Sequence, residues 1–124
     1  MGLFSFGGKK EGVEPIKWVQ LTSESQIDEL IKESNEQPVM FFKHSTRCSI
    51  SSMALSRLEN NWDLKDITPV YLDLLTYRPI SDKLAEVFAV DHQSPQVILV
   101  KDGISVLDIS HSQISVDAIK PYLC

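Results

Sequence analysis

One cysteine lies where the sequence predicts that a strand gives way to a helix. Residues 39–42 form an apolar run rich in β-formers, which is typical of a buried strand. Apolar residues then recur at helical spacing, which predicts a helix over residues 48–60. The predicted apolar stripe consists of Ile50, Ala54 and Leu58, with Met53 and Trp62 beside it. The polar residues between the two elements deliver Cys48 to the start of this helix.

The surroundings of Cys48 favour its ionised form. A thiol at a helix start faces unpaired backbone N–H groups and the positive end of the helix dipole. Arg47, the preceding residue, adds a full positive charge. Both effects favour the thiolate, which is the nucleophilic form of cysteine. We therefore interpret Cys48 as the reactive centre, and the alternative is a small, buried and inert side chain.

Length, charge and composition bound the possible functions. The chain has 124 residues, the size of one domain of about 100–150 residues. Its net charge of −5 argues against nucleic acid as the main partner, and no apolar run approaches the roughly 20 residues of a membrane span. No signal peptide is expected, and Cys48 and Cys124 do not make the pattern of a secreted disulfide framework. We expect a cytoplasmic monomer.

The chain alternates predicted strands and helices. We expect residues 1–14 to be a flexible N-terminal leader, because they are rich in glycine. Residues 15–124 are expected to form the folded domain. The predicted elements are strand 17–21, helix 23–34 with a capping box at its start, strand 39–42, helix 48–60, strand 67–74, a helix capped by Ser81, strand 96–100, strand 105–109 and a short helix capped by Ser115 and ended by Pro121. The first five of these predict crossover units on a parallel sheet.

The end of the chain is predicted to differ from this pattern. Asp102-Gly103 is a hairpin signal, so the last two strands are expected to be antiparallel. In the preceding helix, Leu84, Val87 and Phe88 are expected to form the buried face. Trp18 and Trp62 are most simply core residues.

This order, β-α-β-α-β-α-β-β-α, with a cysteine at the start of the second helix and a proline just before the fourth strand, resembles the thioredoxin fold. The resemblance covers residues 17–123. It implies an α/β domain with a central mixed sheet flanked by helices. It also implies that Pro95 follows a cis peptide bond beside Cys48, and that the backbone of Ser94 pairs with an incoming substrate chain.

The sequence departs from dithiol thioredoxins in two places. The second cysteine of their Cys-x-x-Cys pair is Ser51 here, and the buried acid six residues before their nucleophile is Phe42. A protein with one active-site thiol does not readily reduce a disulfide by forming its own short one. It can still exchange with a mixed disulfide and accept a small thiol onto Cys48.

The run from Ser45 to Ser51, together with Ser94-Pro95-Gln96, is similar to the monothiol bacilliredoxin family. That resemblance implies removal of a low-molecular-weight thiol, bacillithiol, from S-thiolated proteins. It implies Cys48 as nucleophile, Arg47 as thiolate stabiliser and Ser51 as a hydroxyl donor to the sulfur. The residues implied in substrate binding are Thr46, Ser94, Pro95 and Gln96. Bacillithiol would be a co-substrate, and no metal is implied.

Two other functions stay open. One is a non-catalytic peptide-binding module with a thioredoxin fold, in which Cys48 is incidental. The other is a glutathione-dependent, glutaredoxin-like protein, although Cys48-Ser49-Ile50-Ser51 does not match the Cys-Gly-Phe-Ser motif of monothiol glutaredoxins. Arg47 beside a helix-start cysteine has no obvious structural purpose, and this favours the redox function.

Other candidate residues carry less weight. His44 follows the predicted strand and could touch the thiolate, but exposure or a structural hydrogen bond is the simpler expectation. His92 and His111 stand alone, and no cysteine–histidine spacing predicts a zinc site. Asp73 is expected to pair locally. Cys124 is expected at the end of the domain opposite Cys48, beyond the reach of a disulfide.

Overall fold

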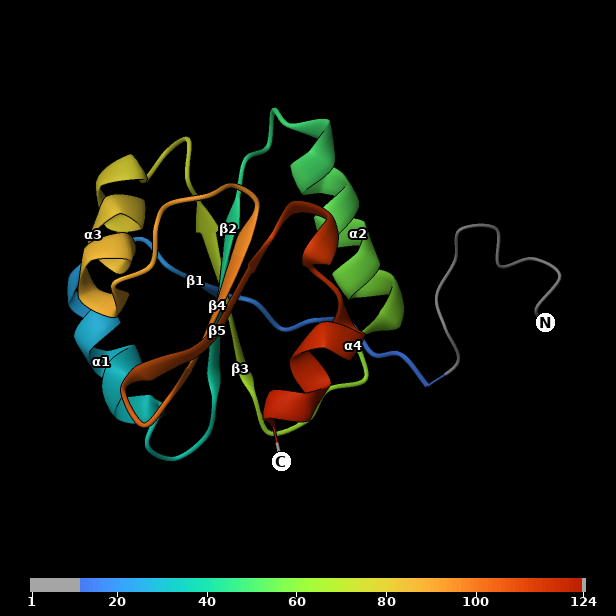
Figure 1. Ribbon diagram of the computed structural model, residues 1–124, viewed down its shortest axis with the longest axis horizontal. Helices are drawn as coiled ribbons and strands as arrows, with labels where there is room; N and C mark the ends of the chain where they lie inside the picture. The colour runs from blue at the N-terminus through green and yellow to red at the C-terminus, as the bar shows by residue number, and fades with distance from the viewer. Residues whose placement is uncertain (1–11, 124) are drawn as a thin grey trace, which may run out of the picture.

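The computed structural model describes residues 12–123 and holds a five-stranded mixed sheet (Figure 1). The strands lie in the order β1 (Val19–Gln20), β3 (Thr68–Asp73), β2 (Val39–His44), β4 (Gln96–Lys101) and β5 (Ile104–Ser110). β1, β3 and β2 are parallel, whereas β4 is antiparallel to both β2 and β5. The predicted element order and mixed sheet of the thioredoxin fold are confirmed.

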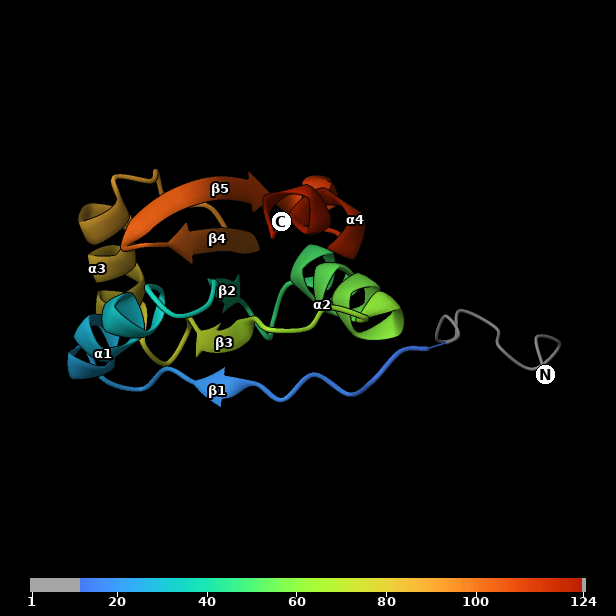
Figure 2. The ribbon, with the colours of Figure 1, turned by 90° about the horizontal axis from the view of Figure 1, so that it is seen from below.

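Helices cover both faces of the sheet and make three layers (Figure 2). α1 (Ser25–Glu33) and α3 (Arg78–Phe88) lie on one face, and α2 (Ser49–Asn61) and the short α4 (Val116–Ile119) lie on the other. Two single-turn 3-10 helices, η2 (His111–Gln113) and η3 (Lys120–Tyr122), flank α4. Within residues 12–123, no helix combines the length and the apolar character that a membrane crossing requires.

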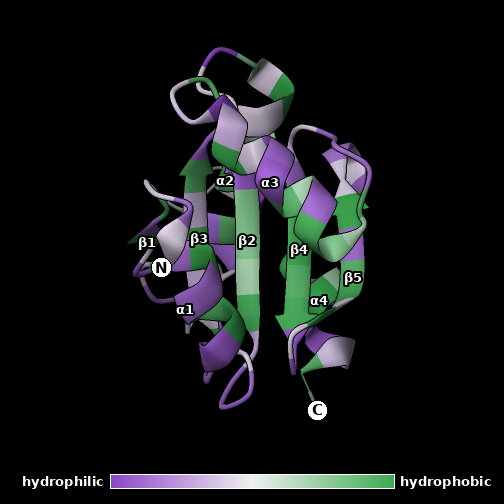
Figure 3. Ribbon diagram, turned by 90° about the vertical axis from the view of Figure 1, so that its left-hand side faces the viewer, coloured by the Kyte–Doolittle hydropathy of each residue, from purple (hydrophilic) through white to green (hydrophobic). Residues whose placement is uncertain are grey.

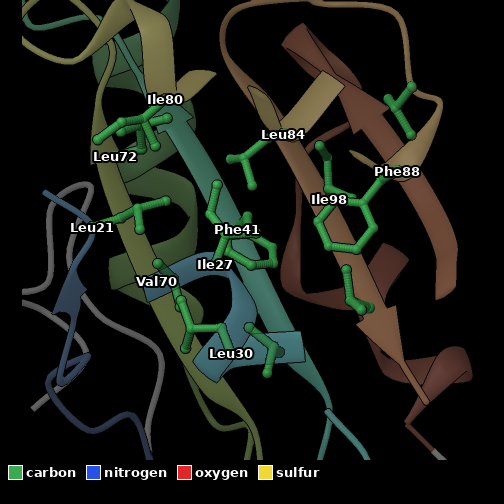
Figure 4. Close-up of a cluster of buried hydrophobic side chains, with 13 residues drawn as sticks. Leu21, Ile27, Leu30, Phe41, Val70, Leu72, Ile80, Leu84, Phe88 and Ile98 are labelled. Carbon is green, nitrogen blue, oxygen red and sulfur yellow. The ribbon is translucent and has the colours of Figure 1, made fainter. Parts of the chain in front are cut away.

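The central strand β2 supplies side chains to two cores. Because side chains alternate along a strand, Val39 and Phe41 belong to the cluster under α1 and α3, which Figure 4 shows. Met40 and Phe42 belong to the cluster under α2 and α4. Figure 3 shows β2 and β4 as apolar over most of their length, with the polar surfaces of α1 and α3 outside them. The sheet is therefore a rigid base for the loops at its ends.

Local signals explain how several elements begin and end. Asp102 (φ 51°) and Gly103 (φ 76°) both have the left-handed backbone that a two-residue hairpin turn requires, so the predicted hairpin is confirmed. Ser115 caps α4 through a 3.1 Å hydrogen bond from the Ala118 N–H. At α1, Gln26 Oε1 accepts the N–H of Ser23 at 2.9 Å, the second half of a capping box.

Two predictions for α3 are wrong. Ser81 is not its cap: the helix begins at Arg78 after the N-cap residue Tyr77, and Ser81 is fully buried inside the first turn. Pro79 marks this start, because a proline fits the first turn of a helix, where its missing N–H has no partner to lose. Val87, expected with Leu84 in the buried face, is 39% exposed because it lies at the edge of that face.

The N-terminal leader is described only at its end. Residues 1–11 lie outside the described residues. Val13 packs against the core cluster under α2 and α4, and the Glu14 N–H donates to the Trp62 carbonyl at 3.1 Å. Trp18 stacks on Phe42 with ring centroids 5.7 Å apart, so the segment before β1 contacts the same core.

Candidate active site

Cys48 is the N-cap residue of α2, one position before the first helical residue (φ −108°, ψ 121°). Its N–H donates to the Ser45 carbonyl at 3.2 Å, and its carbonyl accepts the Ser52 N–H at 3.0 Å. The thiol is half-buried and free, and it makes no capping hydrogen bond. The helix-start position that the sequence predicts is confirmed. The sulfur therefore remains accessible next to the unpaired N–H groups of the first turn.

Ser51 lies in that first turn but is directed away from the predicted partner. Its side chain is fully buried, and its Oγ accepts the Ser45 N–H at 3.0 Å and lies 2.7 Å from His44 Nδ1. The expected hydrogen bond from Ser51 to the Cys48 sulfur is not formed, because the hydroxyl is occupied by the loop that precedes Cys48.

Of the two alternatives expected for His44, exposure or a structural hydrogen bond, the structure has the second, since His44 Nδ1 lies 2.7 Å from Ser51 Oγ. His44 is the last residue of β2 and only 4% exposed, so it does not lie free on the surface. Burial lowers the pKa of its imidazole, and the Asp73 carboxylate opposes that effect, so the ring is neutral near pH 7. Period-two alternation could have found its role, since Met40, Phe42 and His44 share the face that α2 covers.

The proline loop lies at the same end of the sheet. The peptide bond between Ser94 and Pro95 is cis, as predicted. Gln96 pairs with Lys43 in the β2–β4 ladder, so Pro95 lies beside the end of β2 from which the chain leads to Cys48. Pro95 is buried, and its carbonyl accepts the N–H of His111 at 3.1 Å.

Gln96, which was expected to contact substrate, is buried, and its substrate contact stays a prediction. The side chain is 1% exposed, and its Nε2 donates to the Asp91 carbonyl at 2.9 Å. Gln96 therefore fastens the loop before β4. Ser94 is half-buried, and its expected pairing with a substrate chain stays a prediction.

Two depressions flank the start of α2. One, of about 450 Å³, is lined by Thr46 and Arg47 from the loop before Cys48 and by Asp73, Leu75 and Thr76 from the loop after β3. The other, of about 320 Å³, is lined by Ile50, Met53, Arg57, His111 and Ser112. The first is polar and the second is mainly apolar. The structure thus brings predicted residues Thr46 and Arg47 together with Asp73, which the sequence analysis did not connect to them.

The apolar depression corrects the predicted stripe of α2. Ala54 and Leu58 are fully buried as expected, but Ile50 is 51% exposed and Met53 is 61% exposed. These two side chains lie on the first two turns of α2, where they line the apolar depression together with His111 and Ser112 of η2. Arg57 closes the far side by donating to the carbonyls of Ile114 at 2.9 Å and His111 at 2.8 Å. An apolar surface therefore begins two residues from Cys48.

A second polar cluster lies on the other face of the sheet. Lys43, fully buried in β2, has its Nζ 3.3 Å from His92 Nδ1, which is also 3.3 Å from Ser81 Oγ. The sequence analysis expected His92 to stand alone, but in the structure it contacts Lys43 and Ser81. Burial lowers the pKa of Lys43 to about 8, although the Asp82 carboxylate opposes the shift.

Comparison with known proteins gives the family. The family described as monothiol bacilliredoxin BrxC matches residues 19–119, which include the whole sheet from β1 to β5, Cys48 and the cis proline. The chain belongs to the monothiol bacilliredoxins. The resemblance seen in the Ser45–Ser51 run is confirmed.

Solved structures agree with the fold of this bacilliredoxin. A proposed oxidoreductase with a thioredoxin fold is 29% identical, with a TM-score of 0.74 over 83% of this chain and 90% of that one. Mitochondrial thioredoxin 3 from Saccharomyces cerevisiae is 19% identical, with a TM-score of 0.63 over 86% and 92% of the two chains. Thioredoxin from Trypanosoma brucei brucei is 11% identical, with a TM-score of 0.67 over 91% and 95%. The family and the fold together support a thiol-redox function.

Proposed function

We propose that this bacilliredoxin removes a low-molecular-weight thiol, bacillithiol, from protein mixed disulfides by nucleophilic attack of Cys48. The observation that carries the proposal is the position of Cys48 as an accessible N-cap residue with a buried serine, Ser51, in place of a partner thiol. No other cysteine lies within residues 12–123, so exchange there stops at a mixed disulfide.

The proposed reaction consists of two successive thiol–disulfide exchanges. The Cys48 thiolate attacks the sulfur of the small thiol in a protein–S–S–R disulfide, where R is the rest of the small thiol. The bond between Cys48 and R–S forms, the protein–S bond breaks, and the target protein leaves as a thiolate. A second molecule of the small thiol then attacks Cys48–S–S–R, which restores the Cys48 thiolate and releases the symmetrical disulfide R–S–S–R.

Two features near Cys48 support this chemistry. Cys48 is the half-buried N-cap residue of α2, next to the unpaired N–H groups of the first turn, and Arg47 is the adjacent residue. Positive charge near a cysteine sulfur in general favours the thiolate, which is the form that attacks and that leaves. Ile50 and Met53 offer an apolar surface against which the target protein can pack.

The alternative of a two-cysteine enzyme is disfavoured by the register of the sheet. Lys101 Nζ donates to the Tyr122 carbonyl at 3.0 Å. Lys101 is the last residue of β4, next to Val100, which pairs with Val39 at the start of β2. Cys48 follows the opposite end of β2, about 17 Å away for five residues of strand. Cys124 itself lies outside the described residues, and its inactivity as a resolving thiol stays a prediction.

Transfer of the modification tests the proposal. The protein would be incubated with one target protein carrying bacillithiol and with the same target carrying glutathione, and intact mass spectrometry would follow both partners. We expect bacillithiol to move to Cys48 faster than glutathione, Cys48→Ser to abolish transfer and Cys124→Ser to leave it unchanged. Faster transfer of glutathione would support the glutaredoxin-like function. If neither small thiol moves to Cys48, the result would support the alternative function, a non-catalytic peptide-binding module.

A further inference from the structure

The depression lined by Thr46, Arg47, Asp73, Leu75 and Thr76, called here the polar pocket, lies between two loops at one end of the sheet. His44 and Asp73 are paired at the ends of β2 and β3, and the Leu74 N–H donates to the His44 carbonyl at 3.0 Å. The loop that leads to Cys48 and the loop that leads to α3 are therefore tied together at their base. The pocket's position is fixed by the sheet.

The carboxylate in this pocket is held in place. Asp73 Oδ1 accepts the Leu75 N–H at 3.1 Å and the Thr76 N–H at 3.4 Å, and Oδ2 accepts the Thr76 hydroxyl at 2.8 Å. Oδ1 thus accepts twice, whereas Oδ2 keeps a lone pair for another donor. Within residues 12–123, no lysine, arginine or histidine makes an ion pair with Asp73. Its charge acts on the surroundings, since it raises the pKa of Tyr71 in addition to the larger effect of burial.

The opposite charge lines the same pocket. Arg47 is exposed, and within the described part of the chain it has no carboxylate within ion-pair distance. Arg47 and Asp73 thus share a pocket without neutralising each other. A guanidinium presents a planar set of donors to a carboxylate, and a carboxylate accepts from an ammonium. The pocket volume of about 450 Å³ is within the usual range for small-molecule sites.

We propose that the polar pocket binds the charged groups of the small thiol while its sulfur is bonded to Cys48, with Asp73 accepting from an ammonium and Arg47 donating to a carboxylate. This rests on the proposed function. It predicts a substrate class: thiols with a free amino group on the cysteine that carries the reacting sulfur and an acid group further away. Bacillithiol has both groups. The cysteine nitrogen of glutathione is an uncharged amide and cannot make an ion pair with Asp73.

Simple symmetrical disulfides test the two charges separately. The probes are cystamine, which carries only ammonium groups, dithiodipropionate, which carries only carboxylates, and the neutral 2-hydroxyethyl disulfide. The rate at which each thiolates Cys48 would be measured by intact mass spectrometry in a Cys124→Ser background. The rate with the neutral probe corrects for any change in the reactivity of the thiol itself.

Expected results differ between the variants. Asp73→Asn should slow cystamine by about fivefold to tenfold relative to the neutral probe, and Arg47→Gln should slow dithiodipropionate by a similar factor. Asp108→Asn, an exposed aspartate on β5, is the matched control and should change no ratio. Equal slowing of all three probes by Asp73→Asn would overturn the proposal, because it would mean that Asp73 acts through the fold or the thiol.

The outcomes also separate this proposal from the function on which it rests. If the wild-type protein takes bacillithiol from a target protein but shows unchanged probe ratios in Asp73→Asn and Arg47→Gln, the function stands and the polar pocket is not the thiol site. If none of the disulfides thiolates Cys48, not even the neutral one, the proposed function is wrong, and the role of the polar pocket is wrong with it.

Discussion

Ser51 Oγ lies 2.7 Å from His44 Nδ1, and both side chains are buried. The contact joins the last residue of β2 to the first turn of α2, across the loop that holds Cys48. The Ser51 oxygen also accepts the Ser45 N–H, so one hydroxyl fastens that loop at two points. In a dithiol thioredoxin the second cysteine would stand here. Ser51 therefore holds the loop before Cys48 in place, at the position where a dithiol thioredoxin has its resolving thiol.

The first prediction is that Ser51→Ala destabilises the domain by about 1–3 kcal/mol, because the buried Ser45 N–H and His44 Nδ1 both lose a partner. Urea denaturation measures the change. Ser49→Ala, at an exposed position in the same turn, is the control and should stay within about 0.5 kcal/mol of the wild type. Equal stability of the two variants would show that the buried contact contributes nothing.

The second prediction concerns Ser51→Cys. The N-cap and third helical positions are one turn apart, so the two sulfurs should form an internal disulfide and release a thiol captured on Cys48. Mass spectrometry of the oxidised variant follows the release. Ser56→Cys, about 12 Å further along the helix than Cys48 at ~1.5 Å per residue, is the control and should keep the mixed disulfide. Retention of the captured thiol by Ser51→Cys would contradict the geometry.

The third prediction uses the buried Lys43. Its pKa is about 8 in the folded protein and near 10.5 when unfolded, so between these values the unfolded chain binds more protons. The contribution of Lys43 to the free energy of unfolding therefore rises with pH across that window, and below it the buried ammonium lowers stability. Its neighbours are His92 after α3, and Asp82 and Arg78 on α3.

Lys43→Met removes this titration and should stabilise the domain by about 1–3 kcal/mol at pH 7. The difference from the wild type should shrink as the pH rises from 8 towards 10.5. Urea denaturation at several pH values measures it, and Lys83→Met, at a half-exposed site on α3, is the control. A difference between Lys43→Met and wild type that stays constant with pH would show that Lys43 does not titrate in this window.

The fourth prediction separates the two kinds of substrate. Ile50 and Met53 are exposed, so Met53→Ser should change the free energy of unfolding by less than about 0.5 kcal/mol. It should nevertheless slow transfer from a thiolated protein several-fold, because the target loses an apolar contact, and leave the reaction with 2-hydroxyethyl disulfide unchanged. Val106→Ser, exposed on β5, is the control. A parallel loss with both substrates would show that Met53 acts on the thiol rather than on docking.

The sequence was sufficient wherever a property depends on a few neighbouring residues. The apolar run before Cys48 and the helical spacing after it predicted the strand, the helix and the cysteine at their junction. Asp102-Gly103 predicted the hairpin because the left-handed backbone of its turn is a local requirement. Ser81 was mistaken for a cap although Pro79 marked the true start of α3 in the same few residues.

Only the tertiary structure decided which side chains meet and which stay uncovered. Ile50 and Met53 fit an apolar stripe but are exposed, because periodicity along α2 carries no information about which parts of the helix its neighbours cover. Gln96 follows Pro95 in sequence yet is buried. Lys43 meets His92, and Arg47 shares a pocket with Asp73, because the order of the strands brings together loops that are distant in the chain. These contacts follow from how the layers pack, whereas the local backbone preferences that the sequence reveals extend over only a turn or a strand.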